Sequence, residues 1–391
     1  MILIARRSRH FAGTRYLKRG LNEEGRVANF VEIEQIVYSH KSRDDKPLIS
    51  SFVQIRGSIP LFWSQDPNPL VAKPDVFVNT SDVDFLATKR HFCDLFQQYS
   101  FPVIIYNLTK EKDTRECKLS DLYRYAVNEV LNCELPDDKK LFYAHFDVKK
   151  FRKKERFMTY SFNYIDSFLD HIGIFYTKMI KPGDSKIGIT IQRGVIRTNC
   201  IDSLDRTNLI QTLVGLRALE RQLKSLNIIM NEENLSSSSE IFTSFQKSFE
   251  VMGDELSLQY GGSIAHHASL SKKKGFFKNA IPELLTSVRR HWANNFSDSS
   301  KQGAINLFLG MYIPKNNDTP LWNLDSDEIL HQCDEHRLPK LQENWWDNYL
   351  SRYEYKLPKE IINEKLNFYI SYDKLNETQR PQFLPEQKIS I

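Results

Sequence analysis

The sequence is poor in cysteine, with five in 391 residues. They are Cys93, Cys117, Cys133, Cys200 and Cys333, an odd number with no close pair and no C-x-x-C spacing. Disulfide scaffolds and structural zinc sites depend on cysteines paired at such spacings. The pattern therefore argues against both kinds of protein and favours a reducing compartment.

Long apolar runs and a strong net charge are also lacking. No stretch approaches the roughly 20 apolar residues of a membrane-spanning helix, and the opening MILIARRSRHF has too short an apolar run for a secretory signal. We therefore expect any membrane contact to be peripheral. The formal charge of +5 is only mildly basic, so an anionic partner should be met by a local patch of the surface.

What the sequence does contain is an alternation of strand and helix patterns. The 41% hydrophobic and 12% aromatic residues indicate a globular protein. Apolar periodicity predicts strands at 1–5, 27–39, 47–63, 101–109, 140–148 and 186–200, and helices at 83–100, 118–133, 160–179 and 209–230. These elements predict an α/β fold, a mixed sheet flanked by helices. They place Cys200 at the end of a strand.

The stretch RTNCIDSLDRTN, residues 197–208, puts Cys200 six positions before Arg206. A loop between a buried strand and a helix directs backbone N–H groups and the positive helix end toward an anion. Such a field favours the thiolate form of a cysteine. We therefore expect a C-x5-R phosphate-binding loop, with Cys200 as nucleophile and Arg206 donating two N–H bonds to phosphoryl oxygens. Because the spacing alone is a weak signal, a buried structural cysteine stays an alternative.

The same loop holds two carboxyl groups, Asp202 and Asp205, which are the candidate general acids and bases. We favour Asp202 as the proton donor, because Asp205 adjoins Arg206 and an ion pair with it would lower the pKa of Asp205. Both aspartates could instead only cap the following helix. Thr207 and Asn208 are expected to brace the loop.

The motif resembles the R-x-N-C-x-D-C-L-D-R-T-N signature of the Sac-domain phosphoinositide phosphatases, with Ser203 in place of the second cysteine. Blocks at 6–36, 53–66 and 253–263 are also similar to Sac domains. The resemblance implies a Sac catalytic domain over 1–335 and a carboxy-terminal extension over 336–391. It also implies that the amino-terminal Sac subdomain is absent and that the chain begins inside the domain.

The blocks LSLQYGGS, AINLFLGMYIP and LWNLDSDEILH look most like the branch that removes the 5-phosphate of phosphatidylinositol 3,5-bisphosphate in the endosomal lipid-kinase complex. That resemblance implies a phosphocysteine intermediate, no required cofactor, and magnesium at most as an activator. The implied partners are a phosphoinositide head group, an anionic membrane, a scaffold protein and a phosphatidylinositol 3-phosphate 5-kinase. The implied location is cytoplasmic, on endosomal, lysosomal or vacuolar membranes. A catalytically weak Sac-like scaffold and a phosphatase of phosphatidylinositol monophosphates stay open.

The remaining polar and basic residues are assigned to the substrate or to the membrane. For substrate binding we expect Asn199, Ser203, Thr207 and Asn208, with Arg15 and Arg19 at the non-reacting phosphate. Lys149, Lys150, Arg152, Lys153 and Lys154 are expected to face anionic lipid, although a solvated helix face would look the same. The interleaved aromatic and basic residues near the amino terminus would also accept single-stranded nucleic acid, but the family resemblance favours phosphoinositide and no nucleic acid. We expect no metal site, and interpret His266 and His267 as a surface pair.

Overall fold

A computed structural model describes residues 1–39, 48–65, 74–79, 82–152, 157–178, 189–230, 235, 239–262, 264–265, 298–315, 319–324, 326–331, 341 and 344–346. All of these lie in one compact unit, Met1–Trp346. Several residues of the sequence interpretation lie outside the described part. They are Lys153 and Lys154, the pair His266 and His267, and Cys333, and the side chain of Arg152 also lies outside it. The boundary near residue 335 stays a prediction.

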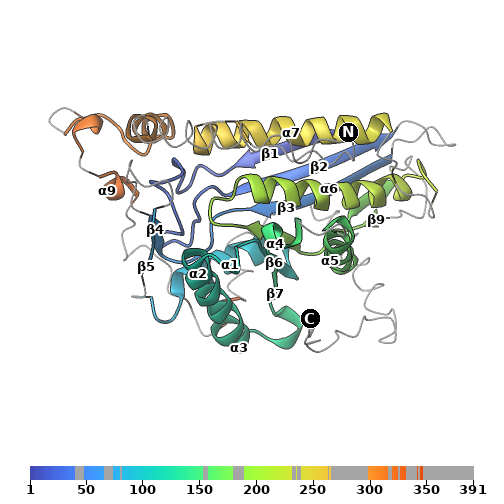
Figure 1. The fold of residues 1–391 in the computed structure, drawn as a ribbon, viewed down its shortest axis with the longest axis horizontal. Helices are drawn as coiled ribbons and strands as arrows, with labels where there is room; N and C mark the ends of the chain where they lie inside the picture. The colour runs from blue at the N-terminus through green and yellow to red at the C-terminus, as the bar shows by residue number, and fades with distance from the viewer. Residues whose placement is uncertain are drawn as a thin grey trace, which may run out of the picture. The chain divides into compact units, whose positions relative to one another are not determined.

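A mixed sheet forms the centre of this unit (Figure 1), and its main strands follow the order β1-β2-β3-β10-β6-β7. The strands are β1 Ile2–Arg7, β2 Val31–Ser39, β3 Leu48–Arg56, β6 Val103–Asn107, β7 Phe142–His145, β8 Phe175–Lys178, β9 Ile189–Thr190 and β10 Val195–Asn199. The pairs β1–β2 and β2–β3 are antiparallel, whereas β10 is parallel to β3 and β6, and β6 to β7. A separate ribbon joins β4 Trp63–Gln65 to β5 Val76–Val78.

Helices cover both faces of the sheet. Alternate side chains of a strand point to opposite faces, and in the central strand β6 the side chains on both faces are apolar and need to be buried. Ile104 and Tyr106 pack in one apolar cluster with α5 Phe157–Ile172 and α6 Asp205–Ser225. Val103 and Ile105 pack in another with α1 Leu86–Tyr99 and α2 Thr114–Tyr125. All five residues of β6 are buried, as the sequence predicts for a strand covered on both faces. Helix α7, Glu240–Gly261, packs against α6 and β1.

Shorter helices complete the described part. They are the π-helix η1 Ala126–Leu131, α3 Asn132–Glu134, η2 Asp137–Lys139, α4 Val148–Arg152, η3 Leu321–Asn323 and α9 Glu328–His331, with a further helix over 298–308. No helix of the described residues has both the length and the apolar character that crossing a bilayer requires.

Several predicted boundaries are wrong, among them the following three. The helix expected over 160–179 ends at Ile172, since Gly173 has a φ of 66° and the following residues form β8 against β3. The strand expected over 186–200 is divided into β9 and β10. The helix expected over 209–230 spans Asp205–Ser225, so Arg206 lies in its first turn.

The parallel strands bring their carboxyl ends to one edge of the sheet. Asn107 pairs with Asn199 on one side and with His145 on the other, so β6, β10 and β7 end level with each other. In open sheets of this kind, ligands bind beyond the carboxyl ends of the strands. This edge is where the predicted phosphate-binding loop lies.

Candidate active site

The loop after β10 folds around the sulfur of Cys200. Cys200 Sγ accepts hydrogen bonds from the backbone N–H of Ser203 at 3.1 Å and from Thr207 Oγ1 at 3.3 Å. Ser203 has a φ of 50°, which turns the loop back over the sulfur. Cys200 itself is only 1% exposed. Two donors from the loop are thus aimed at one buried sulfur.

Arg206 is held by a glutamate from another part of the chain. Its NH1 donates to Glu116 Oε2 at 2.6 Å and to the Leu108 carbonyl at 2.8 Å, and NH2 donates to Glu116 Oε1 at 3.1 Å. Burial lowers the pKa of Arg206, but attraction to Cys200 and Glu116 outweighs burial and raises it. Nε and the second hydrogen of NH2 have no protein acceptor among the described residues. That edge of the guanidinium is suited to two phosphoryl oxygens.

Asp202 is bound by two arginines. It accepts bonds from Arg15 Nε at 3.2 Å and Arg15 NH2 at 2.8 Å, and from Arg19 NH2 at 2.7 Å. Burial favours the neutral acid, but Arg15 and Arg19 outweigh it and hold the pKa of Asp202 well below its usual range. Asp202 is therefore an ionised carboxylate in this state.

These contacts reverse the argument by which the sequence favoured Asp202 as proton donor. That argument assumed that Asp205 takes Arg206 as its ion-pair partner, whereas Arg206 pairs with Glu116, and Asp202 itself pairs with Arg15 and Arg19. Asp205 is the first residue of α6 and is partly exposed. Arg15 and Arg19 reach the loop as expected, but both bond to Asp202, and Arg19 also donates to the Ile201 carbonyl and to Gln65 Oε1.

Asn199 and Asn208 both bond to neighbouring protein groups. The Asn199 side chain donates to Asn107 Oδ1 at 2.8 Å and accepts from Arg197 NH1 at 3.2 Å. Asn208 Oδ1 accepts from Arg56. Asn208 thus lies where a bracing residue should, and the substrate roles of both asparagines stay predictions.

Arg56, at the end of β3, is a residue of this site that the sequence interpretation missed. Its guanidinium is fully buried and donates to the carbonyls of Ser203 and Leu204 and to the side chains of Asn208 and Gln211. Burial lowers its pKa to about 10, although Cys200 and Asp205 act to raise it. The only sequence signal is an arginine that ends an apolar strand, FVQIR. Arg56 therefore holds the backbone of the loop in place and adds a buried positive charge next to it.

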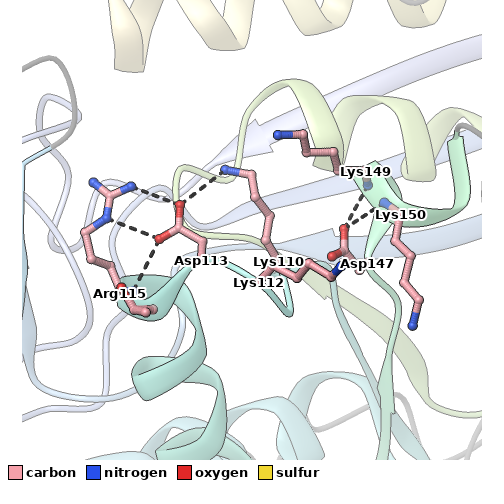
Figure 2. Close-up of a pocket in the computed structure, with 8 residues that line it drawn as sticks. Lys110, Lys112, Asp113, Arg115, Asp147, Lys149 and Lys150 are labelled. Carbon is pink, nitrogen blue, oxygen red and sulfur yellow. Dashed lines mark hydrogen bonds and ion pairs between the residues drawn. The ribbon is translucent and has the colours of Figure 1, made fainter.

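Part of the basic segment lines a pocket at the same edge of the sheet. Lys149 and Lys150 belong to α4, and Figure 2 shows them with residues that follow β6. The pocket has a volume of about 640 Å³ and is lined by Lys110, Lys112, Asp113, Thr114, Arg115, Asp147, Lys149 and Lys150. Lys110 Nζ lies 2.8 Å from Glu116 Oε1, so one carboxylate joins this pocket to Arg206.

The fold and this site define a mixed α/β protein with a buried cysteine in the loop at a strand-to-helix junction. Residues 1–153 match the model of the SacI homology domain. This part of the chain is therefore similar to the SacI homology domain, in agreement with the resemblance seen in the blocks at 6–36 and 53–66. The match lies in the amino-terminal part of the chain, and the predicted absence of an amino-terminal subdomain stays a prediction.

Curated relatives of the chain have phosphatase names. The chain is 36% identical to phosphatidylinositol-3-phosphatase SAC1 of Arabidopsis thaliana, over 84% of this chain and 43% of that protein. It is 37% identical to the polyphosphoinositide phosphatase of Schizosaccharomyces pombe, over 79% of this chain and 38% of that protein. It is 30% identical to phosphatidylinositol-3-phosphatase SAC1 of Saccharomyces cerevisiae, over 80% of this chain and 49% of that protein. The chain thus spans less than half the length of these relatives.

Proposed function

We propose that this chain is a phosphoinositide phosphatase that hydrolyses a phosphomonoester through a phosphocysteine intermediate on Cys200. The observation that carries the proposal is the sulfur of Cys200, which accepts two hydrogen bonds from its own loop at the carboxyl end of β10. The names of the relatives support the substrate class.

The first step is attack of the Cys200 thiolate on phosphorus, with departure of the inositol oxygen. Arg206 donates its Nε–NH2 edge to the phosphoryl oxygens, while Glu116 holds the opposite edge. Arg56 lies beneath the loop with its positive charge near Cys200. These fixed donors stabilise the charge that develops in the transition state, so the protein groups alone can support the reaction.

The leaving oxygen needs a proton, and in the proposal Asp205 supplies it. Asp202 is a poor donor in this state because Arg15 and Arg19 keep it ionised. In the second step, water attacks the phosphocysteine and Asp205 accepts a proton from it. Asp202 then acts by fixing the two arginines beside the loop.

For the substrate we propose phosphatidylinositol 3,5-bisphosphate, with the 5-phosphate as the leaving phosphoryl group. Support comes from the sequence blocks LSLQYGGS and AINLFLGMYIP and from the polyphosphoinositide phosphatase among the relatives. The proposal includes peripheral binding to endosomal, lysosomal or vacuolar membranes, together with a scaffold protein and a phosphatidylinositol 3-phosphate 5-kinase. A second candidate is removal of the 3-phosphate from phosphatidylinositol 3-phosphate, because two relatives are named as 3-phosphatases.

Phosphate release from short-chain lipids tests the proposal. The wild-type chain should release phosphate from phosphatidylinositol 3,5-bisphosphate, and the Cys200→Ser variant should not. The lipid product separates the two candidates, since loss of the 5-phosphate leaves the 3-phosphate and the reverse cleavage leaves the 5-phosphate. Equal release by wild type and Cys200→Ser would disprove the enzyme and favour a scaffold.

A further inference from the structure

We infer that the pocket lined by Lys110, Lys112, Arg115 and Lys149 is a second phosphate subsite, which holds a non-reacting phosphate of the inositol head group. This inference rests on the proposed function and deepens it, because it assigns the substrate's second charge to residues outside the Cys200 loop. The sequence interpretation had placed that phosphate at Arg15 and Arg19 and had given Lys149 and Lys150 to the membrane.

The first observation is where the available positive charge lies. Arg15 and Arg19 share one carboxylate, Asp202, and Arg19 also donates to the Ile201 carbonyl and to Gln65 Oε1, so several of their N–H groups are already used. The pocket is lined by five cationic side chains and only two carboxylates. Of these carboxylates, Asp147 accepts backbone N–H bonds from Lys149 and Lys150, and Asp113 pairs with Arg115. An excess of positive charge therefore remains in the pocket.

Two ammonium groups of the pocket carry most of that excess. Lys112 and Lys149 are exposed and form no ion pair with any described residue. Lys150, in contrast, pairs with Glu111 at 2.9 Å, and Figure 2 shows its side chain extending away from the other lysines. Lys112 and Lys149 are thus the residues that an additional anion would engage.

The second observation is shape. The volume of about 640 Å³ is within the range of pockets that bind small molecules. Lys110 and Arg115 are recessed, with side-chain exposures of 28% and 25%. A compact polyphosphate engaged by the exposed Lys112 and Lys149 could also reach these recessed cations, whereas a flat bilayer surface would meet only the exposed side chains.

The third observation is the connection to the reacting centre. Glu116 accepts bonds from Lys110 Nζ at 2.8 Å and from Arg206 NH1 at 2.6 Å. One buried carboxylate therefore lies between the pocket and the arginine of the Cys200 loop. A head group whose reacting phosphate contacts Arg206 would have the pocket as its neighbouring cationic surface.

Binding of soluble head groups to the full chain carrying Cys200→Ser tests the inference, since this background removes turnover. The probes are inositol 1,3,5-trisphosphate, inositol 1,3-bisphosphate and inorganic phosphate, measured by calorimetry. Adding Lys112→Ala and Lys149→Ala should weaken the trisphosphate about tenfold and leave inorganic phosphate unchanged. The matched control, Lys118→Ala with Lys247→Ala, removes two exposed charges outside the pocket and should change neither.

Several results would overturn the inference. One is an unchanged trisphosphate affinity, and another is equal weakening by the two double variants. A third is loss of sedimentation with phosphatidylserine vesicles at unchanged head-group affinity, which would make the pocket a membrane surface. Phosphate release by the wild-type chain is measured alongside. If no phosphate is released but the tenfold difference in trisphosphate affinity is seen, the proposed enzyme activity is wrong and the subsite stands. If phosphate is released but the affinity difference is absent, the subsite is wrong and the enzyme activity stands.

Discussion

Glu116 and Arg206 form a two-point ion pair across 90 positions of the chain, at 2.6 and 3.1 Å. Glu116 is only 4% exposed and also accepts from the backbone N–H and the ammonium group of Lys110. The arginine is therefore oriented before any substrate arrives. This preorganisation is what electrostatic stabilisation of a transition state requires.

Replacing Glu116 with Gln should slow turnover by about tenfold, because Gln keeps the size but cannot accept two charge-assisted bonds from Arg206. A positioning role predicts that kcat falls more than KM rises, and steady-state kinetics on a short-chain phosphoinositide would show this. Glu129→Gln, an exposed position on η1, is the control and should leave kcat unchanged. A wild-type kcat for Glu116→Gln would mean that Arg206 needs no partner.

Arg206→Lys should be nearly as inactive as Arg206→Ala, with turnover lower than wild type by about two to three decades. Lysine keeps the charge beside Glu116 but cannot offer a second edge with parallel donors to the phosphoryl group. Melting temperature should stay near that of wild type, which separates the chemical loss from unfolding. If Arg206→Lys keeps more than about a tenth of wild-type turnover, the bidentate role is wrong.

The assignment of proton donor predicts a dependence on the leaving group. In a single turnover, Asp205→Asn should slow transfer of the phosphoryl group from a phosphoinositide to Cys200 by at least about a hundredfold but spare the burst of para-nitrophenol from para-nitrophenyl phosphate, whose leaving group needs no proton. Hydrolysis of the phosphocysteine, in which Asp205 is the base, should slow for both substrates. Asp202→Asn should impair both substrates, because Arg15 and Arg19 lose the carboxylate that fixes them. The opposite pattern, with the aryl substrate spared only in Asp202→Asn, would restore Asp202 as the acid.

The sequence predicted the parts of this site that are close in the chain. The alternation of strands and helices placed Cys200 at the end of a strand, and the C-x5-R spacing placed Arg206 in the loop that follows, whereas the structure puts Arg206 in the first turn of α6. Arg56 and Glu116 were not predicted, because they reach the loop across 147 and 90 positions, through the pairing of β3 with β10 and the packing of α2. Periodicity reports which face of an element is buried, and it does not report which polar groups meet across the sheet.

The predicted end of the helix over 160–179 was wrong for a related reason. Its last residues, FYTK, have β-branched and aromatic side chains suited to a strand, and they pair with Leu48–Ser51 after the turn at Gly173. The helical spacing of the apolar residues continued past the point where the chain reverses. The pairing of these residues with β3 makes them a strand and not the end of a helix.

Asp298 should make stability depend on pH. Burial raises its pKa to about 6, although Lys301 and Arg15 act in the opposite direction. Because the folded state binds this proton more tightly than the unfolded chain, stability falls as the pH rises from about 4 to 6, by up to about 3 kcal/mol. Asp298→Asn should therefore melt several degrees above wild type at pH 7 and level with it near pH 4.

The control for that measurement is Asp137→Asn, a 98% exposed position that should shift the melting temperature little at either pH. Comparing each variant with wild type at the same pH removes the effect of the other carboxyl groups. An equal shift for Asp298→Asn at pH 4 and pH 7 would show that Asp298 is ionised at neutral pH without cost.

Trapping the covalent intermediate tests the central claim most directly. Wild-type chain mixed with a short-chain phosphatidylinositol bisphosphate is quenched in denaturant within one turnover, and the peptide containing Cys200 is examined by mass spectrometry. The account predicts one added phosphoryl group on Cys200, absent from Cys93, Cys117 and Cys133 and absent in the Cys200→Ser variant. Phosphate release by the wild type with no phosphoryl group on Cys200 at any quench time would contradict it.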